Sequence, residues 1–162
     1  MVEADDSVES LYVANRADGV RLHALRWGRG PRLVVGVHGL NATGYHWRRT
    51  AERLSAAYTF VAFDLRGHGD SDKPPTGYTH DDCAGDLDAV VRRFAADAEG
   101  VVVMGHSLGA RVSFPYVIAQ PPAGFVIVDP GIVAHTTEGP PPPRNPRRRP
   151  LVMEYEIGRS HI

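Results

Sequence analysis

The sequence of 162 residues contains one cysteine, one lysine and no long hydrophobic run. The single cysteine, Cys83, cannot form an intramolecular disulfide, so the core has to stabilise the fold. No apolar run approaches the ~20 residues of a membrane-spanning helix. The acidic first residues also contain no apolar segment typical of a signal peptide. We therefore expect a cytoplasmic protein with no membrane partner.

The sequence also lacks an excess of charge of either sign. Lys and Arg together number 18, Asp and Glu number 19, and the net charge is -1. This balance excludes the strongly basic surface of a typical nucleic-acid-binding domain. The length suits one domain with a sizeable core. We expect a small molecule as the partner, and no nucleic acid.

The composition changes near residue 134. Apolar runs alternate with helical or glycine-rich stretches before this point, whereas residues 135–162 contain few apolar side chains. Six prolines and four arginines fall within Pro140–Pro150. Proline fixes φ and removes a backbone donor, which is typical of an extended linker. We expect residues 1–134 to form a core and residues 135–162 to be poorly ordered.

Short apolar runs in the first part predict strands, and the stretches between them predict helices. Near-continuous apolar runs are typical of strands buried on both faces. They occur at residues 33–37, 60–63, 101–104 and 125–128, while residues 11–14 and 20–27 flank a turn and predict an antiparallel hairpin. Helices are expected at residues 46–57, after Thr79 and at residues 108–119, where Pro115 should kink or shorten the helix.

This alternation predicts an α/β fold. Its sheet should be mostly parallel, with helices on both faces and an antiparallel hairpin at the N-terminal side. Ligands of such sheets lie at the carboxyl ends of the strands. The chemistry should therefore follow the apolar runs.

The most specific motif is Gly105-His106-Ser107-Leu108-Gly109, which matches G-x-S-x-G between an apolar run and a helical stretch. A tight turn there projects the serine hydroxyl outward, and small flanking residues allow close backbone approach. The N–H of Leu108, at the start of the helix, can stabilise negative charge on an oxygen atom. We predict Ser107 as a nucleophile and Leu108 as an oxyanion donor.

A second motif, His38-Gly39-Leu40, directly follows the run at residues 33–37. Its glycine lets the backbone turn the N–H of Leu40 toward the same oxygen. We interpret His38 as a structural histidine, because no second histidine or cysteine stands at metal-ligand spacing. No metal and no organic cofactor is expected.

A third motif, DLRGHGDSDKP at residues 64–74, follows the run at residues 60–63. We interpret this glycine-rich loop as structural, forming the floor of the same site. Around it, Gly39, His106 and Trp47 are candidates for lining the pocket, although core packing is an equal alternative for Trp47.

Taken together, these motifs resemble the α/β-hydrolase family, over roughly residues 10–131. The resemblance implies a serine hydrolase that attacks ester, amide or related bonds through Ser107, with Leu40 and Leu108 as oxyanion donors. Relatives of the epoxide hydrolase and haloalkane dehalogenase type carry Asp at the nucleophile position, so those reactions are disfavoured. The segment after residue 131 is then the start of a cap.

The resemblance also implies a histidine base and a carboxylate after the nucleophile, for which the sequence offers few candidates, so the activity of this chain is expected to be impaired. The family's last strands are not evident, so the fold is expected to be incomplete there. Asp129 is a candidate acid, His135 a candidate base and His161 a further alternative. The run at residues 125–128 would then be an exposed edge through which chains could self-associate. The alternative function is a non-catalytic binding protein or pseudo-enzyme with a hydrolase-like pocket.

Overall fold

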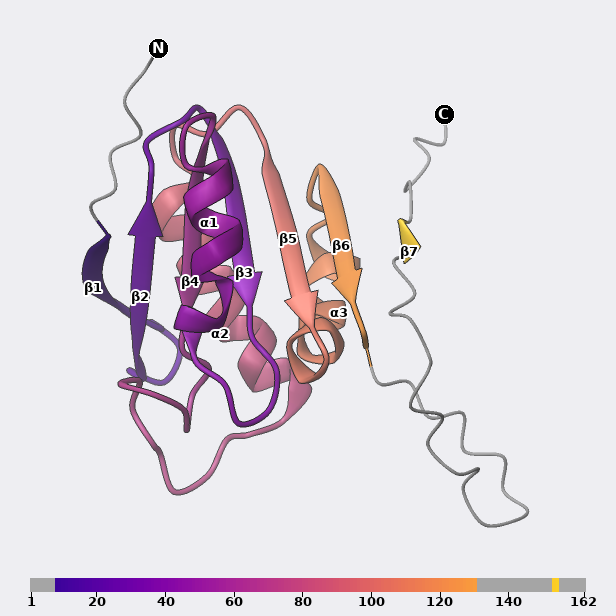
Figure 1. Ribbon diagram of the computed structural model, residues 1–162. Coiled ribbons are helices and arrows are strands. Elements are labelled where there is room, and N and C mark those ends of the chain that lie inside the picture. The colour runs from indigo at the N-terminus through magenta and orange to yellow at the C-terminus, as the bar shows by residue number, and fades with distance from the viewer. Residues whose placement is uncertain (1–7, 131–152, 155–162) are drawn as a thin grey trace, which may run out of the picture.

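The computed structural model describes residues 8–130 and the backbone of residues 153–154. Seven strands in this part of the chain form one sheet in the order β1-β2-β4-β3-β5-β6-β7 (Figure 1). The strands are β1 (Glu9–Ala14), β2 (Arg21–Trp27), β3 (Arg32–Val37), β4 (Tyr58–Phe63), β5 (Val101–His106), β6 (Gly124–Val128) and β7 (Met153–Glu154). The helices are η1 (Gly44–Trp47), α1 (Arg48–Leu54), α2 (His80–Phe94) and α3 (Leu108–Ala119).

The sheet is parallel at its centre and antiparallel at its N-terminal side. Strand β3 pairs in parallel with β4 and β5, and β5 pairs in parallel with β6. Strands β1 and β2 form the predicted antiparallel hairpin, and β2 runs antiparallel to β4. The predicted fold class is confirmed.

Helices cover both faces of the sheet. Figure 1 shows α1 in front of the sheet and α2 and α3 behind it. The core is divided accordingly: Leu87 of α2 and Val112 of α3 belong to the larger apolar cluster, whereas Ala51 of α1 belongs to the smaller one. The strands β3 and β4 contribute side chains to both clusters, which explains why their sequences are almost continuously apolar.

The helix boundaries test the predicted helices. A capping box begins α2 as expected, because the Thr79 side chain accepts the N–H of Asp82 and the Asp82 carboxylate accepts the N–H of Thr79. The predicted helix at residues 46–57 is instead a 3-10 turn followed by the shorter α1. Helix α3 continues through Pro115 to Ala119, so the expected shortening is wrong. The proline removes only the bond to the carbonyl of Arg111, an exposed residue.

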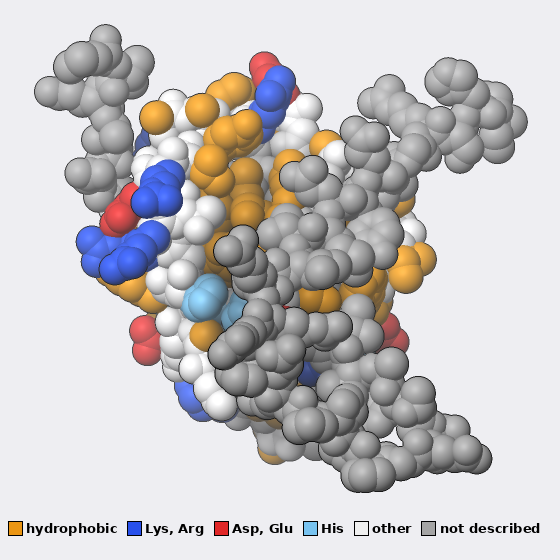
Figure 2. Space-filling view, turned by 45° about the vertical axis from the view of Figure 1, so that its right-hand side comes forward, with side chains coloured by type: hydrophobic (Ala, Val, Ile, Leu, Met, Phe, Trp, Pro, Cys, Tyr) orange, Lys and Arg blue, Asp and Glu red, His pale blue; other side chains and the backbone are white. Residues whose placement is uncertain are grey.

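The edge at β6 differs from the sequence-based expectation. No strand was predicted after Asp129, yet β7 pairs antiparallel with β6 at Val126 and Ile127. Part of β6 is therefore not a free edge, and self-association through it stays a prediction. On the α1 face, Val102, Met104 and Val128 are only partly buried, and Figure 2 shows hydrophobic side chains gathered toward this side of the molecule.

Two further expectations concern the whole chain. Apart from the backbone of β7, residues 135–162 lie outside the described residues, so the predicted division near residue 134 stays a prediction. None of the helices in the described part combines the length and the apolar character that crossing a lipid bilayer requires.

Candidate active site

Ser107 occupies the bend between β5 and α3 in a strained conformation. Its φ of 51° and ψ of -114° lie in a region that residues with a Cβ atom rarely adopt. Close packing holds the bend: a Cβ at Gly105 would lie 2.4 Å from Cα of Ala110, and one at Gly109 would lie 2.2 Å from the Val37 carbonyl oxygen. The N–H of Ser107 donates to the carbonyl of Val128 at 3.0 Å. The bend therefore requires glycine at both positions, because any side chain there would clash with the neighbouring backbone.

The loop after β3 is fixed by His38, which is completely buried. Nε2 of His38 accepts the N–H of Leu65 at 2.9 Å. The other nitrogen, Nδ1, therefore carries the proton and donates to the Gly39 carbonyl at 2.7 Å. Burial lowers the pKa of His38 to about 4, so the ring is neutral near pH 7. The structural interpretation of His38 agrees with these contacts.

The Gly39 carbonyl in turn orients the next peptide group. Because a trans peptide directs its N–H opposite to its C=O, the N–H of Leu40 points away from His38. The Leu40 side chain is 64% exposed. A Cβ at Gly39 would lie 3.2 Å from Cβ of Ser107 and 2.8 Å from Nδ1 of His106, so the loop lies directly against the bend at Ser107.

Two backbone donors beside Ser107 have no acceptor within the described part of the chain. Leu108 is the first residue of α3, and such a residue has no acceptor within its helix. Among residues 8–130, no acceptor takes the N–H of Leu108 or of Leu40. These are the two N–H groups that the sequence predicts as oxyanion donors. Their role as oxyanion donors stays a prediction. That role requires N–H groups that are close to Ser107 and not already bound to an acceptor.

His106, a predicted lining residue, forms a pair with His46 that the sequence analysis missed. The two rings stack with centroids 4.7 Å apart and planes 16° from parallel. Nδ1 of His106 is buried and has no hydrogen-bond partner among the described residues. Burial and the neighbouring His106 both lower the pKa of His46. Nothing in the spacing of residues 46 and 106 signals this pair.

Trp47 is a core residue, so its assignment to the pocket lining is corrected. Its side chain is 4% exposed and packs with Phe60 in the cluster beneath α1. A Cβ at Gly36 would lie 2.8 Å from the indole ring, so the indole rests directly on the backbone of β3. Core packing, the alternative given for Trp47, is the one that the structure supports.

The candidate acid, Asp129, lies one residue beyond the carbonyl that binds Ser107. It is exposed and has a φ of 41°, a left-handed conformation that Asp tolerates better than most residues. Among the described residues, no hydrogen bond joins Asp129 or the Ser107 hydroxyl to a histidine. The candidate bases, His135 and His161, lie outside the described residues.

The loop after β4 is structural, as expected, and is held by two buried charges. Arg66 is 2% exposed and forms an ion pair with the fully buried Asp86 of α2, through Nε at 2.6 Å and Nη2 at 2.7 Å. The Asp64 carboxylate accepts the N–H groups of Gly44 and Asp70. Burial opposes ionisation of Asp64, but these bonds and His23 outweigh it and lower its pKa below the ordinary value.

The contacts of His23 carry no signal in the local sequence. The His23 side chain is 12% exposed, and Nδ1 lies 3.0 Å from Oδ2 of Asp64. The strand register places His23 of β2 opposite the end of β4, so the pair could have been predicted only from the strand order.

A surface hollow of about 1150 Å³ lies between β1 and α2. Arg16, Asp88 and Arg92 line it together with alanines, and none of its lining residues is a predicted site residue. We interpret it as an open groove beside an edge strand. The candidate active site remains the bend at Ser107.

Comparisons with known proteins give the same fold and family. A model of the alpha/beta hydrolase family matches residues 34–160. A 2-(acetamidomethylene)succinate hydrolase of Mesorhizobium japonicum is 37% identical over 112 residues, which are 68% of this chain and 39% of the relative. A soluble epoxide hydrolase of a Corynebacterium species is 38% identical over 108 residues, 67% of this chain and 37% of the relative.

Among solved structures, the crystal structure of an epoxide hydrolase from Vigna radiata superposes with a TM-score of 0.68 at 29% identity. The match covers 76% of this chain and 39% of that one. The chain therefore spans less than half the length of these relatives. The family model, the relatives and the strand-bend-helix at Ser107 agree that this chain belongs to the alpha/beta hydrolase family.

Proposed function

We propose that this chain carries the nucleophile and the oxyanion donors of a serine hydrolase that cleaves ester, amide or related bonds of small molecules. The strained bend at Ser107, with the nearby N–H groups of Leu40 and Leu108 that no described residue accepts, supports this proposal. Ser107 Oγ bonds to the substrate carbonyl carbon, and the two N–H groups bind the oxygen that becomes negative. A base takes the hydroxyl proton and returns it to the leaving group as the bond between the carbonyl carbon and that group breaks. Water then hydrolyses the acyl-enzyme.

The identity of the nucleophile favours acyl chemistry over epoxide opening. Relatives include proteins named as epoxide hydrolases, and hydrolases of that type are expected to carry Asp at the nucleophile position. Serine stands at position 107 instead. The Mesorhizobium relative, named as a hydrolase of 2-(acetamidomethylene)succinate, fits the proposed bond class.

The proposed reaction also needs a base, because a serine hydroxyl alone is a weak nucleophile. Removing the histidine of a Ser-His-Asp enzyme costs about 10⁶ in kcat in the subtilisin example. We keep His135 as the candidate base and Asp129 as the candidate acid. Comparing His135→Gln with His161→Gln tests this assignment, since only the former should slow the reaction.

A fluorophosphonate probe tests the nucleophile directly. We expect the folded protein to be labelled on the peptide that contains Ser107, and the label to disappear in Ser107→Ala. Gly39→Ala should also reduce labelling, because the added Cβ would lie 2.8 Å from Nδ1 of His106, which must shift, and would crowd Ser107. Folded protein that takes no label at Ser107 would overturn the proposal in favour of a non-catalytic, pocket-bearing protein.

A further inference from the structure

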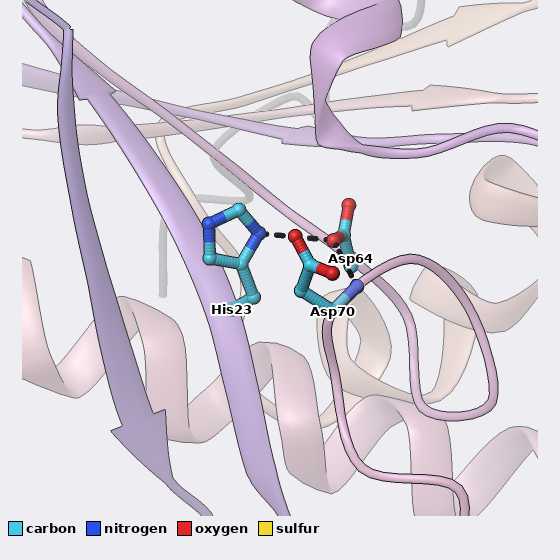
Figure 3. A group of neighbouring side chains, drawn as sticks. All are labelled: His23, Asp64 and Asp70. Carbon is cyan, nitrogen blue, oxygen red and sulfur yellow. Dashed lines mark hydrogen bonds and ion pairs between the residues drawn. The ribbon is translucent and has the colours of Figure 1, made fainter.

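Three side chains outside the site at Ser107 form a continuous hydrogen-bonded row. Ser10 Oγ lies 2.9 Å from Nε2 of His23, and Nδ1 of His23 lies 3.0 Å from Oδ2 of Asp64. Figure 3 shows the His23 ring facing the Asp64 carboxylate, with Asp70 beside them. Ser10 is exposed, whereas His23 is nearly buried and Asp64 is buried.

The strand register produces this row. His23 of β2 lies opposite Tyr12 of β1 on one side, and its carbonyl accepts the N–H of Asp64 on the other. Ser10 stands two residues before Tyr12, on the same face of the sheet and diagonal to His23. Diagonal neighbours of this kind remain within reach of a long side chain. The row is thus set by backbone pairing rather than by a chance approach of flexible side chains.

The carboxylate fixes the direction of the hydrogen bonds. Asp64 is held ionised, because the N–H groups of Gly44 and Asp70 bind its two oxygens and its pKa is lowered. An ionised carboxylate only accepts, so Nδ1 of a neutral His23 carries the proton. Nε2 is then an acceptor, and the bond that it forms with Ser10 is donated by the serine hydroxyl. This is the relation between nucleophile, base and orienting acid in a serine hydrolase.

A metal ion is the competing occupant of this cluster. One ligand atom each from His23, Asp64 and Asp70 lies within 4.8 Å of the others. However, Nδ1 of His23 and Oδ2 of Asp64 already bind each other, and Oδ2 also accepts the N–H of Asp70. The hydrogen-bonded row satisfies these atoms without an ion. The Asp70 carboxylate would instead stabilise an imidazolium formed at His23.

We propose that Ser10 is a second, surface nucleophile, activated by His23 and oriented through Asp64, that accepts the acyl group of activated esters. Ser10 Oγ bonds to the ester carbonyl carbon while His23 Nε2 takes the hydroxyl proton. The bond to the leaving oxygen then breaks, and that oxygen receives the proton from His23. Ser10 remains as an acyl ester, which water hydrolyses by the same steps in reverse.

This site is separate from the one at Ser107. Strand pairing places Ser10 in register with Met104 of β5, four strands away. Four strand spacings correspond to about 19 Å. The two serines therefore act independently, and each can be tested in the absence of the other.

The experiment uses the full chain with Ser107→Ala, so that its outcome does not depend on the function proposed above. The protein is incubated with p-nitrophenyl acetate, and the acetylated peptides are followed by mass spectrometry. We expect acetyl groups at Ser10 that are absent after Ser10→Ala. His23→Asn should slow acetylation of Ser10 at least tenfold, since general bases contribute about 10²–10⁴.

His23→Asn is chosen because its amide N–H can replace Nδ1 as donor to Asp64 while Nε2 is removed. Circular dichroism checks that the variant is folded, and acetylation of Lys73, the single lysine and an exposed one, is the internal control for reagent. Equal acetylation of Ser10 with and without His23 would overturn the proposal. So would an unmodified Ser10 in a sample whose Lys73 is acetylated.

Discussion

The buried imidazole of His38 accepts the backbone N–H of Leu65 across 2.9 Å and so joins the loops that follow β3 and β4. The same ring donates to the Gly39 carbonyl and orients the peptide that presents the Leu40 N–H. Protonating Nε2 would abolish the bond to Leu65. The position of the loop that carries the Leu40 N–H therefore depends on a histidine that stays neutral.

This dependence predicts a loss of stability in mild acid. Burial lowers the pKa of His38 to about 4, whereas the unfolded chain has the ordinary value of 6.5. The unfolded state therefore binds the proton first, and stability should fall as the pH drops from 6.5 toward about 4. The difference corresponds to about 3 kcal/mol in the free energy of unfolding.

Urea unfolding at a series of pH values measures this loss. His38→Gln is the control, because it keeps an acceptor near the Nε2 position but does not titrate. The variant should show a shallower dependence over the same range. Asp64 contributes little to the change over this pH range. Its pKa is lowered below 3.8, so its contribution to the free energy of unfolding is lost only as the pH falls below that value. Identical slopes for the two proteins would contradict the assignment.

The buried ion pair between Arg66 and Asp86 gives a second prediction. Both side chains are almost or completely inaccessible, and Arg66 also donates to the Gly77 carbonyl and to Asp18. Asp86→Asn leaves the guanidinium buried without its main counter-charge, which typically costs about 3–5 kcal/mol. Asp88→Asn is the matched control on the same helix, since Asp88 keeps 26% of its side chain exposed and its partner Arg92 68%. Chemical denaturation should show a large loss for the first variant and under about 1 kcal/mol for the second.

Much of this molecule could be predicted from local sequence. Apolar runs located the central strands, and Thr79 with Asp82 located the start of α2, because both signals act within a few residues. The contacts made by His23, His46 and Arg66 could not be found in this way. Each joins residues that are far apart in the chain and become neighbours only once the sheet and the helices that cover it have assembled. Trp47 shows the same limit, since a helical pattern does not say whether an aromatic ring faces a pocket or the sheet.

Two glycines in helices should respond in opposite ways to substitution by alanine, because one is closely packed and the other is not. A Cβ at Gly109 in α3 would lie 2.2 Å from the Val37 carbonyl oxygen, whereas the nearest atom to one at Gly85 in α2 is 3.5 Å away. We expect Gly109→Ala to lower stability by about 1–3 kcal/mol through overpacking. Gly85→Ala should raise it by about 0.5–1 kcal/mol, because alanine favours the helix. Thermal unfolding of the two variants checks the sign of each change, and destabilisation of both would contradict the reasoning.

The strained backbone at Ser107 predicts a measurable cost in the free energy of unfolding. At a φ of 51° and a ψ of -114°, a residue with a Cβ costs about 1–3 kcal/mol. Glycine adopts such a conformation without that cost. Ser107→Gly and Ser107→Ala both remove the hydroxyl, so any difference between them reports the backbone alone. We expect the glycine variant to be more stable than the alanine variant by about 1 kcal/mol, after the larger entropy of glycine in the unfolded chain is subtracted. Equal stability in urea, or a more stable alanine variant, would show that the bend at Ser107 stores no strain.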